Sequence, residues 1–184
     1  MATTTDIRIT PETRMADLIS AFPGAQRALF RKYHIGGCSS CAFGMDETLA
    51  ELCRRNNDLD ASEVLAHLKS CHEQDETMLL EPAELDRLRK EDHALKLLDV
   101  RTKEEWEAVR IEGAVHMSQE TMQEILSQWP RGILIVIYDH QGRQSLDASA
   151  YFEGQGFTNV KCLRGGIDAW SRLIDANLPR YRLE

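Results

Sequence analysis

The stretch GILIVIYDHQGRQSLDASAYF, residues 132–152, carries three structural signals in direct succession. GILIVI is the most hydrophobic run in the chain and predicts a buried strand. YDHQGRQS is a short polar loop with a central glycine, and LDASAYF has the composition of a helix. A strand, a glycine loop and a helix in this order commonly aim backbone N–H groups at an anion. An aspartate, Asp139, nevertheless stands at the start of this loop, where its own charge would compete with an anionic ligand.

The same alternation of apolar and amphipathic segments extends from about Thr77 onward. Thr102 and Glu105 form a capping box that predicts the start of one of the intervening helices. Short strands separated by helices are typical of a mostly parallel sheet covered by helices. The apolar runs are MLL (78–80), ALKLLDV (94–100), GAVHM (113–117), GILIVIY (132–138) and NVKCL (159–163).

Residues 11–70 have a different pattern, with apolar residues at helical spacing and no convincing strand. Helix starts are predicted at Thr10 before Pro11, at Asp46 before ETLAELC, and at Asp60 with Glu63 three residues on. The acidic, polar segment CHEQDET (71–77) is the natural linker. The sequence therefore predicts an α/β protein: a small all-helical domain over residues 1–74, followed by a sheet domain over residues 75–184.

Composition and charge narrow the class of protein. Of the 184 residues, 42% are hydrophobic and 28% are charged, as in an ordinary globular protein. The formal net charge of −8 argues against a general affinity for nucleic acid or an anionic membrane. The N-terminal residues lack a basic segment followed by an apolar one, and no apolar run approaches the ~20 residues of a membrane span. We expect a cytoplasmic protein with no nucleic-acid or membrane partner.

The five cysteines are an odd number, so reduced or reactive thiols are expected rather than a structural disulfide framework. Cys53 and Cys162 lie in apolar segments and are predicted to be core residues. Cys71, followed by His72, ends a predicted helix near the domain boundary. Cys38 and Cys41 form a C-x-x-C pair, a spacing that in the cytosol more often serves redox or metal chemistry than a static link.

Several motifs of the second domain resemble the rhodanese family over nearly all of residues 77–184. They are LLDVRTKEEWEAVRIEGAVHM (97–117), the strand, loop and helix around YDHQGRQS (138–145), and GFTNVKCLRGGIDAW (156–170). The resemblance implies the rhodanese-like fold and an active-site loop at YDHQGRQS. Val109 and Arg110 depart from it, because the family usually has Gly-His there.

The larger departure lies in the loop itself. The resemblance implies the pattern Cys-Arg-x-Gly-x-Arg or Cys-Arg-x-Gly-x-Thr, whose cysteine accepts a sulfane sulfur as a persulfide. The six residues that take these positions are Asp139, His140, Gln141, Gly142, Arg143 and Gln144. A carboxylate cannot hold a persulfide, but it can accept the N–H bonds of such a loop. Two readings stay open: Asp139 fills the anion position, or it caps the following helix. A catalytic carboxylate is a third reading, which no nearby metal-ligand cluster supports.

Residues 6–71 resemble a small helical domain named for a disulfide and for its association with hybrid-cluster proteins. The motifs are TPETRMADLISAFPGAQRALFRKYHIGGCSSC (10–41) and the ETLAELC segment after it. This resemblance implies that Cys38 and Cys41 form a disulfide. Two alternatives stay open: the thiols pack a tight turn, or Cys38, Cys41, Cys71 and His72 bind zinc.

Two functions from different classes are compatible with these features. The first is a non-catalytic rhodanese-like binding or regulatory module, coupled to a redox-active pair at Cys38 and Cys41 and acting in sulfur or redox metabolism. The second is a thiol/disulfide or persulfide-exchange enzyme that uses the same pair. Rhodanese-type transfer from thiosulfate is not expected in either case. We expect no cofactor, a protein partner in redox or sulfur metabolism, and leave self-association into a homo-oligomer open.

Overall fold

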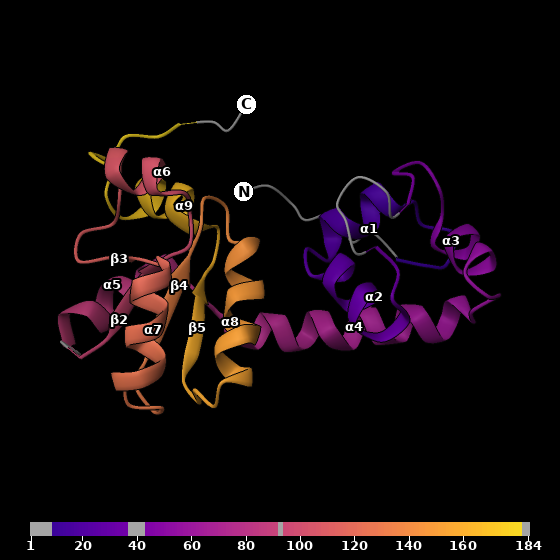
Figure 1. Ribbon diagram of the computed structural model, residues 1–184. Coiled ribbons are helices and arrows are strands. Elements are labelled where there is room, and N and C mark those ends of the chain that lie inside the picture. The colour runs from indigo at the N-terminus through magenta and orange to yellow at the C-terminus, as the bar shows by residue number, and fades with distance from the viewer. Residues whose placement is uncertain (1–8, 37–42, 92–93, 182–184) are drawn as a thin grey trace. The chain divides into compact units, whose positions relative to one another are not determined.

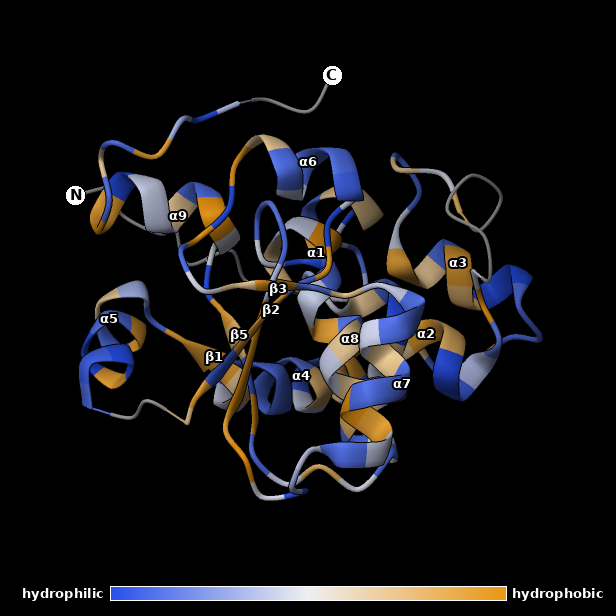
Figure 2. Cartoon of the chain, turned by 60° about the vertical axis from the view of Figure 1, so that its left-hand side comes forward, coloured by the Kyte–Doolittle hydropathy of each residue, from blue (hydrophilic) through white to orange (hydrophobic). Residues whose placement is uncertain are grey.

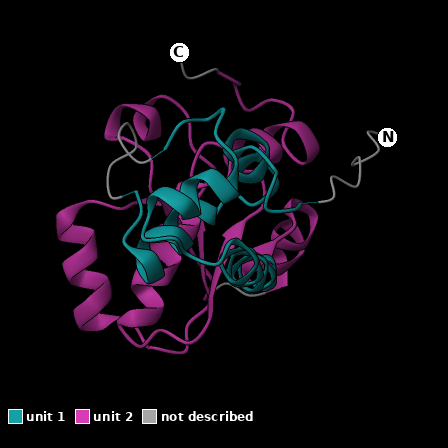
Figure 3. Ribbon diagram, turned by 90° about the vertical axis from the view of Figure 1, so that its right-hand side faces the viewer, with its two compact units in different colours: residues 1–77 teal, residues 78–184 magenta. Residues whose placement is uncertain are grey.

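A computed structural model describes residues 9–36, 43–91 and 94–181 of the chain. The chain divides into two compact units, residues 1–77 and residues 78–184 (Figure 3). The first unit has one buried apolar cluster and the second has two. Among the described residues, no helix is both long enough and apolar enough to cross a membrane.

The first unit is helical, as its sequence pattern predicts. Its helices are α1 (Met15–Ala21), α2 (Ala25–Tyr33), α3 (Leu49–Arg55) and α4 (Ala61–Met78). The three shorter helices lie on one side of α4 (Figure 1). Their apolar faces meet in one core with buried side chains from all four helices: Met15, Leu18, Ala25, Ala28, Leu29, Leu49, Leu52, Cys53, Val64, Leu65 and Leu68. The burial of Cys53 confirms its predicted place in the core.

The starts of these helices differ in part from the predicted ones. The α1 helix begins at Met15, after a turn in which Thr13 N–H donates to the Thr10 carbonyl. The predicted cap Asp46 is wrong, because Thr48 caps α3 in a complete capping box with Glu51. Glutamate stands three residues after Thr48, so only Thr48 can form the reciprocal pair of bonds.

The segment predicted as a linker, residues 71–77, is helical and forms the last turns of α4. Glutamate and glutamine have good helix propensity, and the segment contains neither glycine nor proline to end the helix. Cys71 therefore lies within a helix, not at its end. The ring of His72 packs against Phe22, with the ring centroids 4.7 Å apart.

The second unit is a five-stranded parallel sheet, which confirms the predicted α/β class. Its strands are β1 (Leu79–Leu80), β2 (Lys96–Asp99), β3 (Val115–His116), β4 (Ile135–Tyr138) and β5 (Val160–Leu163), in the order β1-β5-β4-β2-β3. The helices are α5 (Pro82–Glu91), α6 (Lys103–Ala108), α7 (Gln119–Gln128), α8 (Gln144–Gly154) and α9 (Gly166–Leu173). The predicted capping box of Thr102 and Glu105 opens α6.

Helices cover both faces of this sheet, so its strands are apolar while the outer helix surfaces are polar (Figure 2). One face packs against α5 and α9 through Leu85, Ile167 and Trp170. The other packs against α7 and α8 through Ile125 and Phe152. All four residues of the central strand β4 are buried. Cys162 is fully buried in β5, which confirms its predicted place in the core.

The order of the strands determines where a site can form. From β2 the chain moves outward to β3, and it then returns to place β4 on the other side of β2. The loops that follow β2 and β4 therefore diverge at the carboxyl edge of the sheet. In open parallel sheets, ligands bind in the crevice at such a switch point.

Candidate functional site

The carboxylate of Asp139 occupies the turn between β4 and α8. Its Oδ1 accepts a hydrogen bond from the backbone N–H of Gly142 at 2.5 Å. Its Oδ2 accepts from the N–H groups of Arg143 at 2.9 Å and Gln144 at 2.7 Å. Asp139 itself is only 4% exposed. Three N–H groups of the loop thus point at one anion, which is the side chain of Asp139 itself.

The two structural readings of Asp139 describe the same set of bonds. Gln144 is the first residue of α8, and its N–H lacks a partner within the helix. By accepting from Gln144, Asp139 caps the helix although it lies five residues earlier. By accepting from Gly142 and Arg143 as well, it fills the anion position of the loop.

Backbone contacts with the start of α9 hold this loop in place. The N–H of Ile167 donates to the Asp139 carbonyl at 2.9 Å, and the N–H of Asp168 donates to the His140 carbonyl at 3.1 Å. Gly166 has a φ of +59°, and a Cβ there would lie 2.3 Å from the Asp139 carbonyl oxygen. Gly142 has a φ of +82°, and a Cβ there would lie 2.8 Å from the nitrogen of Gly165. Only glycine fits at these two close approaches.

A cavity of about 570 Å³ opens beside the loop, between the segments that follow β2 and β4. It brings together five of the six predicted loop residues, while Gly142 contributes its N–H to Asp139. The lining residues are Val100, Arg101, Thr102, Glu105, Asp139, His140, Gln141, Arg143 and Gln144. Gln141, Arg143 and Gln144 are exposed to solvent, so a ligand or a partner protein can reach them.

His140 is buried at this cavity, and its Nδ1 has no hydrogen-bond partner among the residues that the structure describes. Its ring packs on Tyr181, with the centroids 4.5 Å apart. A buried polar atom without a partner is costly, and it is satisfied when a donor or acceptor enters the cavity.

Sequence reasoning missed the second half of the site, which centres on Arg101. The buried guanidinium of Arg101 pairs with Asp99, with Nη2 to Oδ2 at 2.5 Å and Nε to Oδ1 at 2.9 Å. Its Nη2 also donates to the carbonyl of Val109 at 2.7 Å. Its Nη1 donates to the hydroxyl of Tyr181 at 2.6 Å. The alternation of charge in Asp99-Val100-Arg101, at the end of a strand predicted to be buried, was the available signal.

Tyr181 joins this centre to α6. Its hydroxyl donates to Oε1 of Glu105 at 2.6 Å while it accepts from Arg101. Burial and the Glu105 carboxylate raise the pKa of Tyr181 to about 12. Burial alone would raise the pKa of Glu105, but the hydrogen bonds from Tyr181 and Thr102 outweigh it and hold that pKa below its usual value. The wall opposite Asp139 is thus a fixed hydrogen-bonded chain.

The predicted redox pair, Cys38 and Cys41, lies outside the described residues. The zinc alternative also involves Cys71 and His72, which are described. The His72 ring packs against Phe22, whereas the Cys71 sulfur lies beside His67. Within the described part of the chain, no group of three or more His, Cys, Asp or Glu side chains is placed to hold a metal ion.

Comparison with known proteins identifies the family of the second unit. Residues 81–173 match the rhodanese-like domain, and the chain belongs to this family. A sulfurtransferase of Allochromatium vinosum is 37% identical over 76 residues, which are 41% of this chain and 71% of that protein. The fold prediction made from the motifs of residues 77–184 is therefore confirmed.

Two further relatives match the same region. The probable adenylyltransferase/sulfurtransferase MoeZ of Mycobacterium tuberculosis is 33% identical over 89 residues, 47% of this chain. The match spans only 23% of the length of MoeZ. The crystal structure of a rhodanese-like domain protein from Staphylococcus aureus is 24% identical, with a TM-score of 0.46, and covers 56% of this chain and 98% of that one.

We predict that Tyr181→Phe destabilises the protein at neutral pH by about 1–2 kcal/mol, since it removes the hydrogen bonds to Arg101 and Glu105. Because the pKa of Tyr181 is raised in the folded state, its protonated hydroxyl contributes fully to stability below pH 10, the ordinary pKa of tyrosine. This contribution is lost as the pH rises through about 12. The difference between parent and variant should therefore shrink between pH 10 and pH 12. Urea unfolding across this range measures it, with the exposed Tyr151→Phe as the control.

Proposed function

We propose that residues 78–184 form a non-catalytic rhodanese-like binding or regulatory unit, coupled to a redox-active pair at Cys38 and Cys41. The observation that carries this proposal is the Asp139 carboxylate, which accepts the N–H bonds of Gly142, Arg143 and Gln144. The resemblance to rhodaneses aligns Asp139 with the cysteine that carries sulfur in that family.

The chemistry of the loop supports a role without sulfur transfer. Transfer through a persulfide needs a thiolate, and converging N–H groups assist by stabilising that thiolate. A carboxylate is a weak nucleophile toward sulfur and forms no persulfide. Because Asp139 accepts from the N–H groups of Gly142, Arg143 and Gln144, these three donors are not free to bind an incoming oxyanion.

The cavity beside the loop supports a role in binding. It presents the Nδ1 of His140, which has no hydrogen-bond partner within the described part of the chain, and the exposed side chains of Arg143 and Gln144. The relatives named sulfurtransferases in Allochromatium vinosum and Mycobacterium tuberculosis point to sulfur metabolism as the setting. A protein partner from redox or sulfur metabolism is the ligand that we propose for this face.

The alternative function is an exchange enzyme in which Cys38 and Cys41 handle disulfides or persulfides. The C-x-x-C spacing favours this candidate, because two thiols three residues apart can form a short, reducible disulfide. In this case the cavity beside Asp139 positions the substrate or the donor. The two functions differ in whether Cys38 and Cys41 pass through repeated catalytic cycles with a disulfide or persulfide substrate.

Our first test of the non-catalytic proposal removes Cys38, Cys41 and the partly exposed Cys71. The variant Cys38→Ser, Cys41→Ser, Cys71→Ser retains only Cys53 and Cys162, which are in the two cores. We expect no thiocyanate from thiosulfate and cyanide in this variant, since Asp139 cannot carry sulfur. Thiocyanate formation above the uncatalysed rate would contradict the proposal, because it would require sulfur transfer at the Asp139 loop.

A second test opens the loop. Asp139→Ser removes the carboxylate, leaves N–H groups without their acceptor, and should lower the free energy of unfolding by about 1–3 kcal/mol. Sulfate can then occupy the vacated position and stabilise the variant by mass action. We expect a larger rise in melting temperature with sulfate for Asp139→Ser than for the parent protein.

The control for this test is Asp147→Ser, which removes an exposed carboxylate from the first turn of the same helix. It changes the net charge equally but leaves the loop closed. If sulfate stabilises both variants to the same extent, the effect is general screening of charge, and the Asp139 carboxylate does not exclude anions from the loop.

A third test concerns the redox pair. We expect Cys38 and Cys41 to form a reversible disulfide in mild oxidant and to be alkylated faster than Cys53 and Cys162, which are buried. Closing so short a loop removes little chain entropy, so the bond should add little stability. Differential alkylation followed by mass spectrometry measures the pairing. Unpaired thiols under oxidant, or zinc bound to the purified protein, would exclude the redox role.

A further inference from the structure

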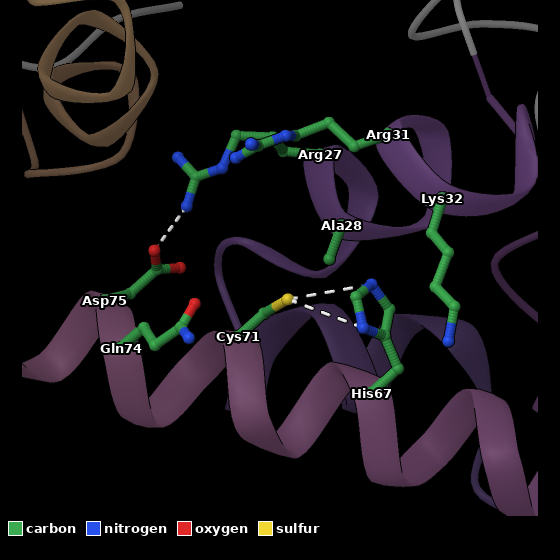
Figure 4. A pocket seen from close by; sticks show the side chains of 8 residues that line it. All are labelled: Arg27, Ala28, Arg31, Lys32, His67, Cys71, Gln74 and Asp75. Atoms are coloured by element: carbon green, nitrogen blue, oxygen red, sulfur yellow. Dashed lines mark hydrogen bonds and ion pairs between the residues drawn. The ribbon is translucent and has the colours of Figure 1, made fainter. Parts of the chain in front are cut away.

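The first unit contains a cavity of about 360 Å³ between α2 and α4 (Figure 4). All of the residues that line it lie in the first unit, so it is separate from the cavity beside Asp139. The cavity is lined by Arg27, Ala28, Arg31, Lys32, His67, Cys71, Gln74 and Asp75. Three cations from one helix thus face a thiol and an imidazole from the other.

The thiol of Cys71 lies beside the ring of His67. The sulfur is 3.6 Å from Nε2 and 3.9 Å from Nδ1. The two residues are four apart on α4, a spacing that places side chains on the same face of a helix. Figure 4 shows both side chains pointing toward each other within the cavity. Both are partly exposed, so the pair is accessible to a small solute.

Burial and the Asp75 carboxylate raise the pKa of the Cys71 thiol, while Arg31, Arg27 and Lys32 act in the opposite direction. The thiol therefore stays protonated at neutral pH until a base accepts its proton. His67 is the base within reach, since its nearer ring nitrogen lies 3.6 Å from the sulfur. A nucleophile with an adjacent base is the arrangement that activates cysteine in catalysis.

The cations are not equally available. Arg27 is bonded to Asp75 at 2.5 Å, and both side chains are largely buried. Lys32 lies 3.4 Å from the exposed Glu63, an ion pair that solvent screens. Arg31 is exposed, and it makes no ion pair within the described residues. Arg31 is thus the cation best able to hold an anion in this cavity.

The pair of Arg27 and Asp75 is part of the packed wall. Gly24 precedes α2, and a Cβ added there would lie 2.1 Å from Oδ2 of Asp75 and 3.0 Å from Nη2 of Arg27. The absence of a side chain at Gly24 lets the carboxylate approach the helix and neutralise Arg27. Asp75 therefore cancels one positive charge of the wall and leaves the charge of Arg31 uncancelled.

We infer that this cavity is a sulfur-accepting site, in which Cys71 accepts the outer sulfur of a small dianion of the thiosulfate type while Arg31 holds its sulfonate oxygens. The inference goes beyond the proposed function, which assigns no role to Cys71. The thiol proton moves to His67, and the thiolate attacks the outer sulfur. The S–S bond of the donor breaks, and sulfite leaves with its electron pair. Cys71 keeps the outer sulfur as a persulfide, so no oxidant besides the donor is needed.

The test uses the full chain and thiosulfate as the probe. After incubation and alkylation, peptide mass spectrometry should find one added sulfur on Cys71, together with released sulfite. The same product should form in the variant Cys38→Ser, Cys41→Ser, which excludes transfer from that pair. Absence of sulfur on Cys71 in either protein would overturn the inference, whereas the thiocyanate test of the Asp139 loop would be unaffected.

Two variants test the roles of individual residues. His67→Gln should slow the appearance of the persulfide about 10²-fold, the scale of a lost general base. Arg31→Gln should raise the thiosulfate concentration for half-maximal rate about tenfold, the effect of one charge-assisted hydrogen bond. The matched control is Arg54→Gln, an exposed arginine on α3 that does not line the cavity.

The melting temperatures of the variants check that they stay folded, so that a loss of thiosulfate binding can be told from unfolding. Equal effects of Arg31→Gln and Arg54→Gln would mean that the cavity holds no oxyanion, and would overturn the inference. The iodoacetate to iodoacetamide rate ratio at Cys71 gives an independent readout, because the two reagents differ in charge. Arg31→Gln should lower this ratio while Arg54→Gln leaves it unchanged.

Discussion

The three hydrogen bonds to the Asp139 carboxylate are the constraint on which the site in the second unit depends. The N–H groups of the loop point inward, and buried donors require an acceptor. Asp139 supplies that acceptor from within the chain, so the loop reaches its final shape without a ligand. The close approaches at Gly142 and Gly166, and the bonds from α9 to the loop carbonyls, all fit the same shape.

In the opposite wall of the cavity, the charge of Arg101 is also paired within the protein. Asp99 and Arg101 are both buried, and removal of either partner would leave an uncompensated charge in the interior. Arg101 also donates to the carbonyl of Val109 and the hydroxyl of Tyr181. Its charge therefore serves mainly to position protein groups. The polar character of the cavity comes instead from His140 and from the exposed loop side chains.

The sequence predicted the features that rest on local pattern. The alternation of apolar runs identified the parallel sheet, and Thr102 with Glu105 identified the start of α6. The network around Tyr181 could not be predicted, because Arg101 lies 80 residues away and no short-range pattern links the two. The pairing of His67 with Cys71 did have a local signal in its four-residue spacing. The adjacent His72 does not share this contact, because neighbouring residues on a helix point in different directions, and its ring packs against Phe22.

The contact between Arg101 and Tyr181 also bears on the order in which the second unit assembles. The segments that carry these residues are separated by three strands and by most of the helices that cover the sheet. A contact between residues 80 apart in the sequence costs loop-closure entropy, so we expect it to form after the strands between them have paired. Local opening of the segment around Tyr181 would then expose the buried guanidinium of Arg101 to water while the sheet stays intact. Amide hydrogens near Val109 would exchange from such a state without global unfolding.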